Sequence, residues 1–395
     1  MADFSPMMKQ YLEIKEQNPN TILFFRLGDF YEMFFKDAEI VSKELELTLT
    51  GKDCGQDERA PMCGVPYHSA ENYIARLISK GYKVAICEQV EDPKMAKGIV
   101  KRAVVRVITP GTVLESSMLD EEKNNYICSM YYNGDSTGIC FADVSTGALY
   151  VNTLKSKNKD NMVYEITNEL ARYTPSEILL NPQALDLRGL RDFIKDKLNS
   201  SVECIPDDEY NENIIKTEVK ERFGDKGIQE LSTLTYSVNA VGVLFSYLKR
   251  TQIIGIERIN EIKYTDSAVM RLDINARRNL ELTETLRNKE RRGSLIWVLD
   301  KTETAMGKRL IKSWVEQPLL NPAKILLRQN AVEELVSDIR KSDEIREGLS
   351  GIFDIERIMS RIVFGSANGR ELRALSSAIE PMPEIKSILS LCSST

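Results

Sequence analysis

The sequence GDFYEMFF at residues 28–35 places an aromatic side chain, Phe30, directly after a tight Gly-Asp turn. An aromatic ring that projects from such a turn can wedge between DNA base steps, unstack them and kink the duplex. Glu32 is an unusual neighbour for a polyanion, and its presence is explained if its carboxyl group hydrogen-bonds a base edge. The alternative is that the Phe side chains belong to the core and that Glu32 is the capping-box partner of Asp29 at a helix start.

A second feature is a run of basic residues without any acidic residue between positions 93 and 114. Its basic members are Lys94, Lys97, Lys101, Arg102 and Arg106. Such a run is typical of phosphate contacts, which fix register on DNA and make affinity salt-dependent. The alternative is a solvated loop followed by the polar face of a strand. We expect Arg106 to be the best candidate for a backbone contact, followed by Lys101 and Arg102, with Arg59 a weaker one.

The elements that position these residues are predicted from apolar periodicity. Residues 22–27, ILFFRL, read as a buried strand, and from Phe30 the pattern predicts a helix whose buried face continues to Leu45. A second helix is predicted near 70–80, with strands at 82–89 and 103–108. The first 115 residues are therefore expected to form a compact mixed α/β domain.

The remainder of the chain changes character twice. Residues 126–153 predict three antiparallel strands, the first two joined by a tight turn at Asn133-Gly134. A helix (161–172), a strand (177–180) and two further helices (187–198 and 232–250) follow, so residues 116–250 are expected to be a second α/β domain. Residues 251–395 are expected to be nearly all helical. The last apolar helix starts near Pro383 and needs a partner surface, so we expect an incomplete domain and a fragment of a longer protein.

Composition excludes several classes of protein. The 395 residues carry a net charge of −6, so only a local patch could attract nucleic acid. A single histidine, His68, argues against histidine-based metal sites, and seven dispersed cysteines are typical of reduced thiols in the cytoplasm. No apolar run is long enough to span a membrane. The sequence contains no G-x-x-x-x-G-K-[ST] motif, so we expect this chain not to be an enzyme and to bind no cofactor.

Longer motifs give the sequence a specific resemblance. The segments that carry it are SPMMKQYL (5–12), FFRLGDFYEMFF (24–35), APMCGVPYHSAENYIARLI (60–78), VAICEQVEDP (84–93), KRAVVRVITPGT (101–112), LDINARRNLELTETL (272–286), LIWVLDKTETAMGKRLIKSWVEQPL (295–319) and RQNAVEEL (328–335). Together they resemble the N-terminal part of the MutS family of DNA mismatch recognition proteins, over essentially the whole chain.

This resemblance implies a role for each part of the chain. Residues 1–115 would be the mismatch-recognition domain, 116–250 an RNase-H-like connector domain, and 251–395 the first part of a helical core and lever domain. In that family the aromatic residue corresponding to Phe30 stacks on a mismatched base from the minor groove, and the glutamate corresponding to Glu32 hydrogen-bonds the same base.

The resemblance also implies partners. These are double-stranded DNA with mismatches or small loops, a MutL-like protein bound through the connector, and a second copy of the full-length protein. For that full-length protein it implies ATP and magnesium as cofactors, DNA-dependent ATPase activity, and a cytoplasmic location in association with the nucleoid.

Two other functions remain open at this point. An RNase-H-like fold allows a metal-dependent nuclease, which would need carboxylates such as Asp143, Glu165 and Glu169 to converge on metal ions about 3.5–4 Å apart. A non-DNA interaction scaffold would instead use Phe30 as part of its core. The solvent exposure of Phe30 separates the scaffold from the wedge.

Overall fold

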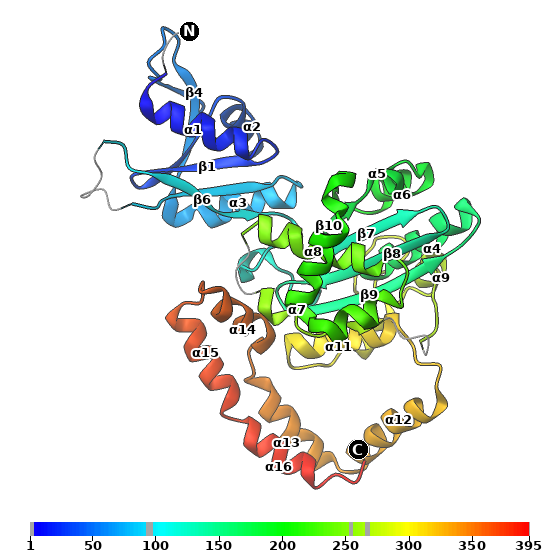
Figure 1. Cartoon of the computed structure of the whole chain (residues 1–395). Helices are drawn as coiled ribbons and strands as arrows, with labels where there is room; N and C mark the ends of the chain where they lie inside the picture. The colour runs from blue at the N-terminus through cyan, green and yellow to red at the C-terminus, as the bar shows by residue number, and fades with distance from the viewer. Residues whose placement is uncertain (1–3, 92–97, 253–255, 265–268, 395) are drawn as a thin grey trace. The chain divides into compact units, whose positions relative to one another are not determined.

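The computed structural model describes residues 4–91, 98–252, 256–264 and 269–394. The chain divides into two compact units, one of residues 1–113 with 245–253 and one of residues 114–244 with 254–395. Each unit contains its own six-stranded sheet (Figure 1). The second and third expected domains therefore share one unit, while the end of a helix near residue 250 belongs to the first.

The first unit is built on a mixed sheet with the strand order β3-β4-β2-β1-β5-β6. Only the pair β1–β5 is parallel; the other pairs are antiparallel. The strands are β1 (Ile22–Leu27), β2 (Phe30–Phe34), β3 (Thr50–Lys52), β4 (Ala60–Pro66), β5 (Val84–Gln89) and β6 (Arg102–Ile108). The strands expected at 22–27, 82–89 and 103–108 are thus present, and the sheet is wider than the sequence pattern predicted.

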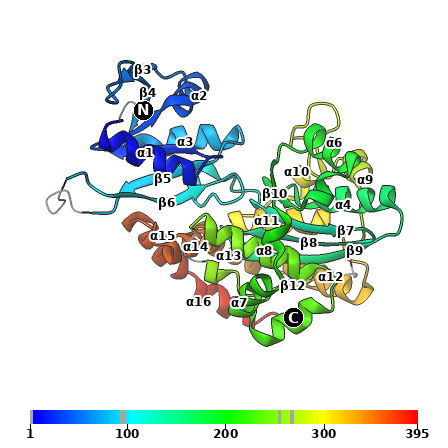
Figure 2. The same cartoon turned by 45° about the horizontal axis from the view of Figure 1, so that its top comes forward.

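Helices cover both faces of this sheet (Figure 1, Figure 2). Helix α1 (Pro6–Gln17) begins at Ser5, whose side chain accepts from the Met8 backbone, and its Tyr11 ring packs edge-on against Phe25 and Phe34. Helix α3 (Ala70–Ser79), expected from the sequence, packs against β4 and β5 with its buried Ile74. The face covered by α1 is called the α1 face here, and the opposite one the α3 face.

The helix expected from Phe30 is wrong for its first five residues. Residues 30–34 form strand β2, and helix α2 (Phe35–Leu45) begins only afterwards. Tyr31 and Met33 are buried on one face of the strand, while Phe34 is buried on the other. Because β2 pairs with β1 on one side and β4 on the other, the ladder hydrogen bonds decide the conformation. The capping box of Asp29 and Glu32 is wrong for the same reason, since α2 has no side-chain cap.

The second unit has a sheet with the order β11-β10-β7-β8-β9-β12. Strands β7 (Ile127–Asn133), β8 (Ser136–Asp143) and β9 (Ala148–Lys155) form the expected antiparallel meander, with Gly134 in the left-handed region at φ +68° in the first turn. Strands β10 (Glu177–Leu180) and β11 (Ser201–Cys204) then add in parallel to β7. This arrangement agrees with the expected RNase-H-like class.

Helices α4 (Lys159–Tyr173) and α6 (Arg188–Lys197) pack on this sheet over a core of buried residues. The remaining helices of eight or more residues are α7 (Glu212–Ser232), α8 (Ser237–Arg250), α11 (Ala305–Glu316), α12 (Pro322–Ser337), α13 (Ile339–Ser350), α14 (Ile355–Phe364), α15 (Gly369–Ile379) and α16 (Met382–Ser390). The shorter helices are α5 (Pro182–Leu185), α9 (Ile274–Asn279) and α10 (Leu295–Leu299), and β12 is Lys263–Tyr264. The expectation of a helical C-terminal region is confirmed.

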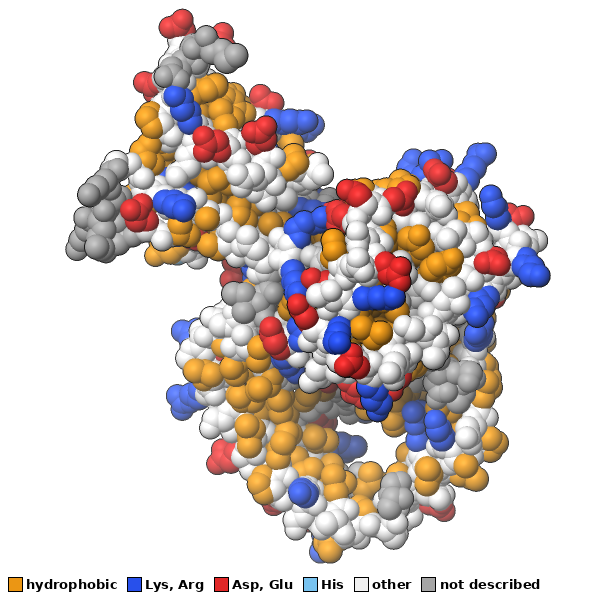
Figure 3. Space-filling model, in the orientation of Figure 1, with side chains coloured by type: hydrophobic (Ala, Val, Ile, Leu, Met, Phe, Trp, Pro, Cys, Tyr) orange, Lys and Arg blue, Asp and Glu red, His pale blue; other side chains and the backbone are white. Residues whose placement is uncertain are grey.

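Buried arginines tie these helices to the rest of the second unit. Arg309 forms ion pairs with Asp354 and Glu356, both at 2.7 Å, and Arg357 donates to the backbone carbonyl of Asp120 at 2.8 Å. In contrast, many apolar side chains of α12–α16 are exposed, and they gather on the face seen in Figure 3. Among the described residues, no helix is both long enough and apolar enough to cross a membrane.

Candidate nucleic-acid interface

Phe30 is the first residue of β2 and stands at the end of a hairpin. Its backbone pairs with Leu27 on one side and with Pro66 on the other. Between the strands, Gly28 adopts φ +56°, in the left-handed region that favours glycine. Although both neighbouring strands hold its backbone, the Phe30 side chain is 46% exposed. A large apolar ring is therefore presented to solvent by a tightly held turn.

Glu32 lies on the same face of β2 as Phe30, because successive strand residues point to alternate faces. Its carboxylate forms an ion pair with Lys52 of β3, and the two side chains are 16% and 32% exposed. On the neighbouring strand β4, Gly64 pairs with Glu32. A Cβ added at Gly64 would lie 3.5 Å from the Glu32 Cγ and 3.3 Å from the Tyr31 carbonyl oxygen, so the glycine leaves room for the Glu32 side chain. The negative charge that seemed out of place beside DNA is thus balanced by a cation from a strand 20 residues away in sequence.

The predicted backbone-contact residues are not brought together around Phe30. Arg102 is buried and donates to three acceptors within the domain: the carbonyl oxygens of Arg26 (2.7 Å) and Val100 (3.0 Å), and the side-chain oxygen of Gln10 (3.0 Å). Lys101 is exposed, immediately before β6. Because β6 begins beside the end of β5, and β5 runs parallel to β1, Lys101 lies at the same end of the sheet as Phe30.

Arg106 and Arg59 occupy other places. Arg106 lies within the edge strand β6, where it pairs with Ile86 on the α3 face, and it donates to the Thr112 carbonyl at 3.3 Å. Arg59 is exposed just before β4, whose far end carries the partner of Phe30, so a strand of seven residues separates the two. Lys94 and Lys97 lie outside the described residues.

The carboxylates proposed for a nuclease have separate partners. Asp143 is fully buried; its Oδ1 accepts from the Ser145 backbone (2.9 Å) and hydroxyl (2.6 Å), and its Oδ2 accepts from the Asn124 side chain (2.7 Å). Glu165 pairs with Arg271 at 3.4 Å, and Glu169 with Arg172 at 3.5 Å. Asp143 therefore stabilises the β8–β9 turn, and the geometry gives the nuclease alternative no support.

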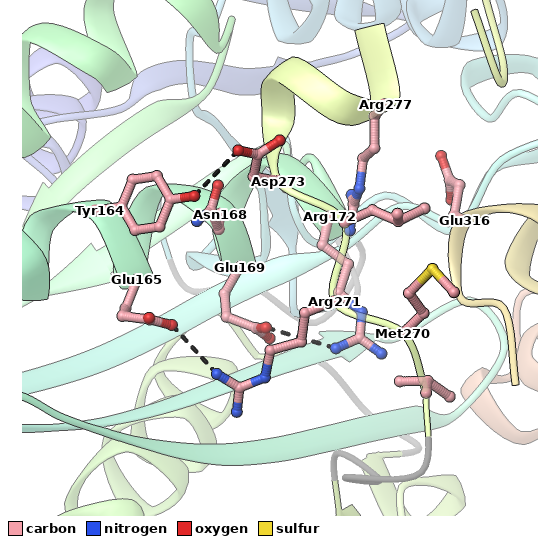
Figure 4. A pocket seen from close by; sticks show the side chains of 12 residues that line it. Tyr164, Glu165, Asn168, Glu169, Arg172, Met270, Arg271, Asp273, Arg277 and Glu316 are labelled. Atoms are coloured by element: carbon pink, nitrogen blue, oxygen red, sulfur yellow. Dashed lines mark hydrogen bonds and ion pairs between the residues drawn. The ribbon is translucent and has the colours of Figure 1, made fainter. Parts of the chain in front are cut away.

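Glu165 and Glu169 instead line a pocket of about 110 Å³ in the second unit (Figure 4). Arg172, Arg277 and Glu316 line it as well, so charges of both signs face each other. Burial raises the pKa of Glu316, although Lys312 and Arg277 oppose this shift. Across the described part of the chain, no group of three or more His, Cys, Asp and Glu side chains is placed to hold a metal ion.

Family models match the chain in three consecutive blocks. MutS domain I matches residues 5–117, MutS domain II matches residues 125–259, and MutS domain III matches residues 275–395. The chain belongs to the MutS family. The expected resemblance is thereby confirmed along the whole sequence, and the α/β, α/β and helical regions of the structure correspond to these blocks in order.

Individual relatives support the same assignment. Proteins named DNA mismatch repair protein MutS are 50% identical in Lachnoclostridium phytofermentans, over 100% of this chain and 42% of the relative, and 50% identical in Ruminiclostridium cellulolyticum, over 98% and 44%. The one from Acetivibrio thermocellus is 48% identical over 98% of this chain and 44% of the relative. The chain thus spans about two fifths of the length of these curated relatives.

Sequence reasoning selected Phe30 and Glu32 but missed Lys52 and two residues beside the turn, Arg26 and Tyr67. The ring of Tyr67 is 45% exposed, close to the exposure of Phe30, and the Arg26 guanidinium stacks on it. The alternation within FYEMF could have indicated a strand and so placed Phe30 and Glu32 on one face. Nothing local in the sequence points to Lys52, because its contact depends on the order of three strands.

Proposed function

We propose that this chain is the DNA-sensing part of a mismatch repair protein. Phe30 inserts from the minor groove at a mismatched or unpaired base, stacks on that base and kinks the duplex, and Glu32 hydrogen-bonds the displaced base. The observation that carries the proposal is the half-exposed ring of Phe30 on a tightly held hairpin, with a carboxylate on the same strand face. The scaffold alternative places Phe30 in the core, and the 46% exposure of the residue argues against that placement.

The physical basis of discrimination is the deformability of the DNA. A correctly paired step resists a wedge because opening it costs a few kcal/mol of stacking energy. A mismatched or unpaired base has already lost part of that energy, so the same wedge kinks it more readily. Specificity that comes from deformability needs no base code, which suits a protein that must find many kinds of error.

Backbone contacts are assigned more narrowly than the sequence suggested. Lys101 is the best supported, since it is exposed at the end of the sheet that carries Phe30. Arg106 is a weaker candidate because it lies on the face of the sheet opposite to Phe30. Arg59 is also weaker, because it lies at the opposite end of β4. Arg102 is left out of the proposed contacts because its guanidinium is buried and donates to protein acceptors.

For the full-length protein we propose the activity that its family resemblance implies. It would be a DNA-dependent ATPase that uses magnesium, forms a homodimer around DNA with mismatches or small loops, and binds a MutL-like partner through residues 116–250. It would act in the cytoplasm, in association with the nucleoid. The names of its relatives support the repair role, and their greater length leaves room for the ATPase.

The test compares Phe30→Ala with Leu49→Ala in the full-length protein. Leu49 is equally exposed, at 46%, and belongs to the same unit, so it controls for loss of apolar surface. Stacking of a base on an aromatic side chain contributes about 1–3 kcal/mol, so Phe30→Ala should lower the ratio of mismatched to matched affinity about 5- to 150-fold. Binding is measured by fluorescence anisotropy, and folding by thermal unfolding.

The three outcomes of this comparison are distinct. Loss of the affinity ratio in Phe30→Ala alone, with an unchanged unfolding temperature, supports the wedge. If Phe30→Ala keeps the parental ratio, the wedge is refuted and the scaffold alternative gains weight. If both variants lose the ratio equally, general apolar contact rather than stacking is responsible, which also contradicts the proposal.

A further inference from the structure

Arg26 lies on the α3 face, opposite to the face of Phe30 and Glu32, because it pairs directly with Tyr31. Its guanidinium carbon lies 3.6 Å from the centroid of the Tyr67 ring, a stacked cation–aromatic contact. Its Nε donates to the Gly28 carbonyl at 2.6 Å, and its Nη1 lies 3.6 Å from Glu88. The side chain is only 18% exposed, so these contacts, rather than solvent, surround it.

Tyr67 holds the same turn by a second route. Its backbone N–H donates to the Asp29 carbonyl at 2.9 Å, one residue after the pairing of Pro66 with Phe30. The carbonyl groups of both turn residues, Gly28 and Asp29, therefore accept hydrogen bonds from the Arg26–Tyr67 pair. The turn between β1 and β2 is therefore held by Tyr67, which directly follows β4, as well as by the pairing within its own hairpin.

The surroundings keep Arg26 in place. Glu88 accepts a hydrogen bond from the Tyr31 hydroxyl, and burial, followed by that hydrogen bond, raises the pKa of Tyr31. Tyr31 is thus a neutral donor at physiological pH, and the Glu88 carboxylate stays available to Arg26. The guanidinium is enclosed by an aromatic ring, a backbone carbonyl and a carboxylate, which leaves it little rotational freedom.

We propose that Arg26, stacked on Tyr67, is a positioning residue that fixes the Gly28–Asp29 turn and thereby the direction in which Phe30 projects. The inference rests on the proposed wedge function and adds what makes the wedge effective. An aromatic ring on a flexible turn loses conformational entropy each time it enters the duplex, and this entropy cost lowers the affinity for DNA. A ring on a braced turn is ordered in advance. The brace acts through the backbone and needs no contact between Arg26 and DNA.

The test uses Arg26→Met and Tyr67→Ala, which remove the stack from either side, and Tyr67→Phe, which keeps the ring and the backbone donor. Full-length variants are titrated with matched and mismatched duplexes. Arg26→Met and Tyr67→Ala should each lower the affinity ratio about 5- to 30-fold, the range expected when about one backbone residue has to be ordered on binding. Tyr67→Phe should retain the parental ratio.

A second measurement tests, in the absence of DNA, whether the side chain at position 30 adopts a single conformation. Fluorinated phenylalanine at position 30 gives a ¹⁹F NMR signal that should be single and sharp in the parent and in Tyr67→Phe. The same signal should broaden or split in Arg26→Met and Tyr67→Ala. A purely structural role for Arg26 would lower the unfolding temperature without changing either the signal or the affinity ratio, and that result would overturn the proposal.

Failure of the brace is distinguishable from failure of the wedge. If Phe30→Ala loses the affinity ratio while Arg26→Met and Tyr67→Ala keep it, the brace is refuted and the wedge stands. If Phe30→Ala keeps the ratio, the wedge is refuted, and an unchanged ¹⁹F signal then refutes the brace as well. If Arg26→Met weakens both duplexes equally and reduces the salt dependence of binding, Arg26 contacts phosphate directly, and the positioning role is wrong.

Discussion

From the ion pair between Glu32 and Lys52, which lies on the α1 face of the sheet with Phe30, we predict that the local charge sets the affinity of the proposed wedge for correctly paired DNA. In the parent the pair is locally neutral. Glu32→Gln leaves a net positive charge there, Lys52→Met leaves a net negative charge, and the double variant is neutral again. Affinity for matched duplex should therefore be highest for Glu32→Gln, lowest for Lys52→Met, and close to parental for the double variant.

The magnitude follows from the exposure of the pair. Two unit charges about 8 Å apart interact by about 0.5 kcal/mol in bulk water and about 2 kcal/mol at the lower dielectric near a protein surface. With 16% and 32% of the two side chains exposed, the pair lies between these limits. A change of one charge beside the phosphates should then alter the dissociation constant for matched duplex about 3- to 10-fold.

The assay is a fluorescence titration of the four full-length proteins with matched and mismatched duplexes at several salt concentrations. Glu32→Gln and the double variant should also lose discrimination, since neither retains the carboxylate that would bond the displaced base, whereas Lys52→Met should retain it. The effects on matched duplex should shrink as salt rises. If the double variant stays as weak as Lys52→Met, or if Glu32→Gln weakens binding to matched duplex, charge balance is not the purpose of the pair.

Three further predictions concern other parts of the chain. Lys101→Gln should weaken matched and mismatched duplex alike and reduce the salt slope by about 0.9, while Arg59→Gln, at the far end of β4, should change it less; equal slopes in salt titrations would contradict this order. Because burial raises the pKa of Glu316, the folded state holds that proton more tightly than the unfolded chain does, and stability from this group is lost as pH rises through the folded pKa. Glu316→Gln should therefore raise the unfolding temperature at pH 7 and have little effect near pH 4, which calorimetry can check; a larger gain at pH 4 would reverse the sign. Finally, the 395-residue chain, which contains no P-loop motif, should release no phosphate from ATP in a coupled assay. Turnover that co-purifies with the chain would show a nucleotide site built without that motif.

Much of the fold was predictable because its signals are local. The apolar run at 22–27, the stripe at 70–80 and the Asn133-Gly134 turn each specify an element through neighbouring residues, and each element is present. Strand β2 was not predicted, because FYEMFF followed by Ala38 and Val41 also fits a helical stripe. Pairing with β1 and β4 decided the matter, and that pairing is a tertiary effect outside the reach of any local pattern.

The residues of the candidate site also differ in whether local sequence signals could identify them. Phe30 and Glu32 could be selected because an aromatic residue and an acid after a tight turn are chemically suggestive on their own. The roles of the basic residues could not be ranked, since Arg102 and Lys101 are adjacent in sequence, yet one is buried and the other exposed. Arg102 is the first residue of β6 and pairs with Gln89, and its guanidinium donates to acceptors of the same unit, whereas Lys101 precedes the strand. That difference becomes visible only once the start of β6 and its register against β5 are known.

On each face of the β1–β2 hairpin, one charged side chain lies beside a side chain of opposite charge. Glu32 pairs with Lys52 on the α1 face, and Arg26 lies beside Glu88 on the α3 face. A strongly basic wedge would bind any duplex tightly, since attraction to phosphate does not depend on sequence or pairing. If Phe30 acts as the proposed wedge, this local charge balance would make affinity there depend on how easily a base step opens. Under the proposed function, charge balance around the exposed Phe30 ring would favour mismatch discrimination over affinity, and attraction to the DNA backbone would come from a separate residue at the same end of the sheet, Lys101.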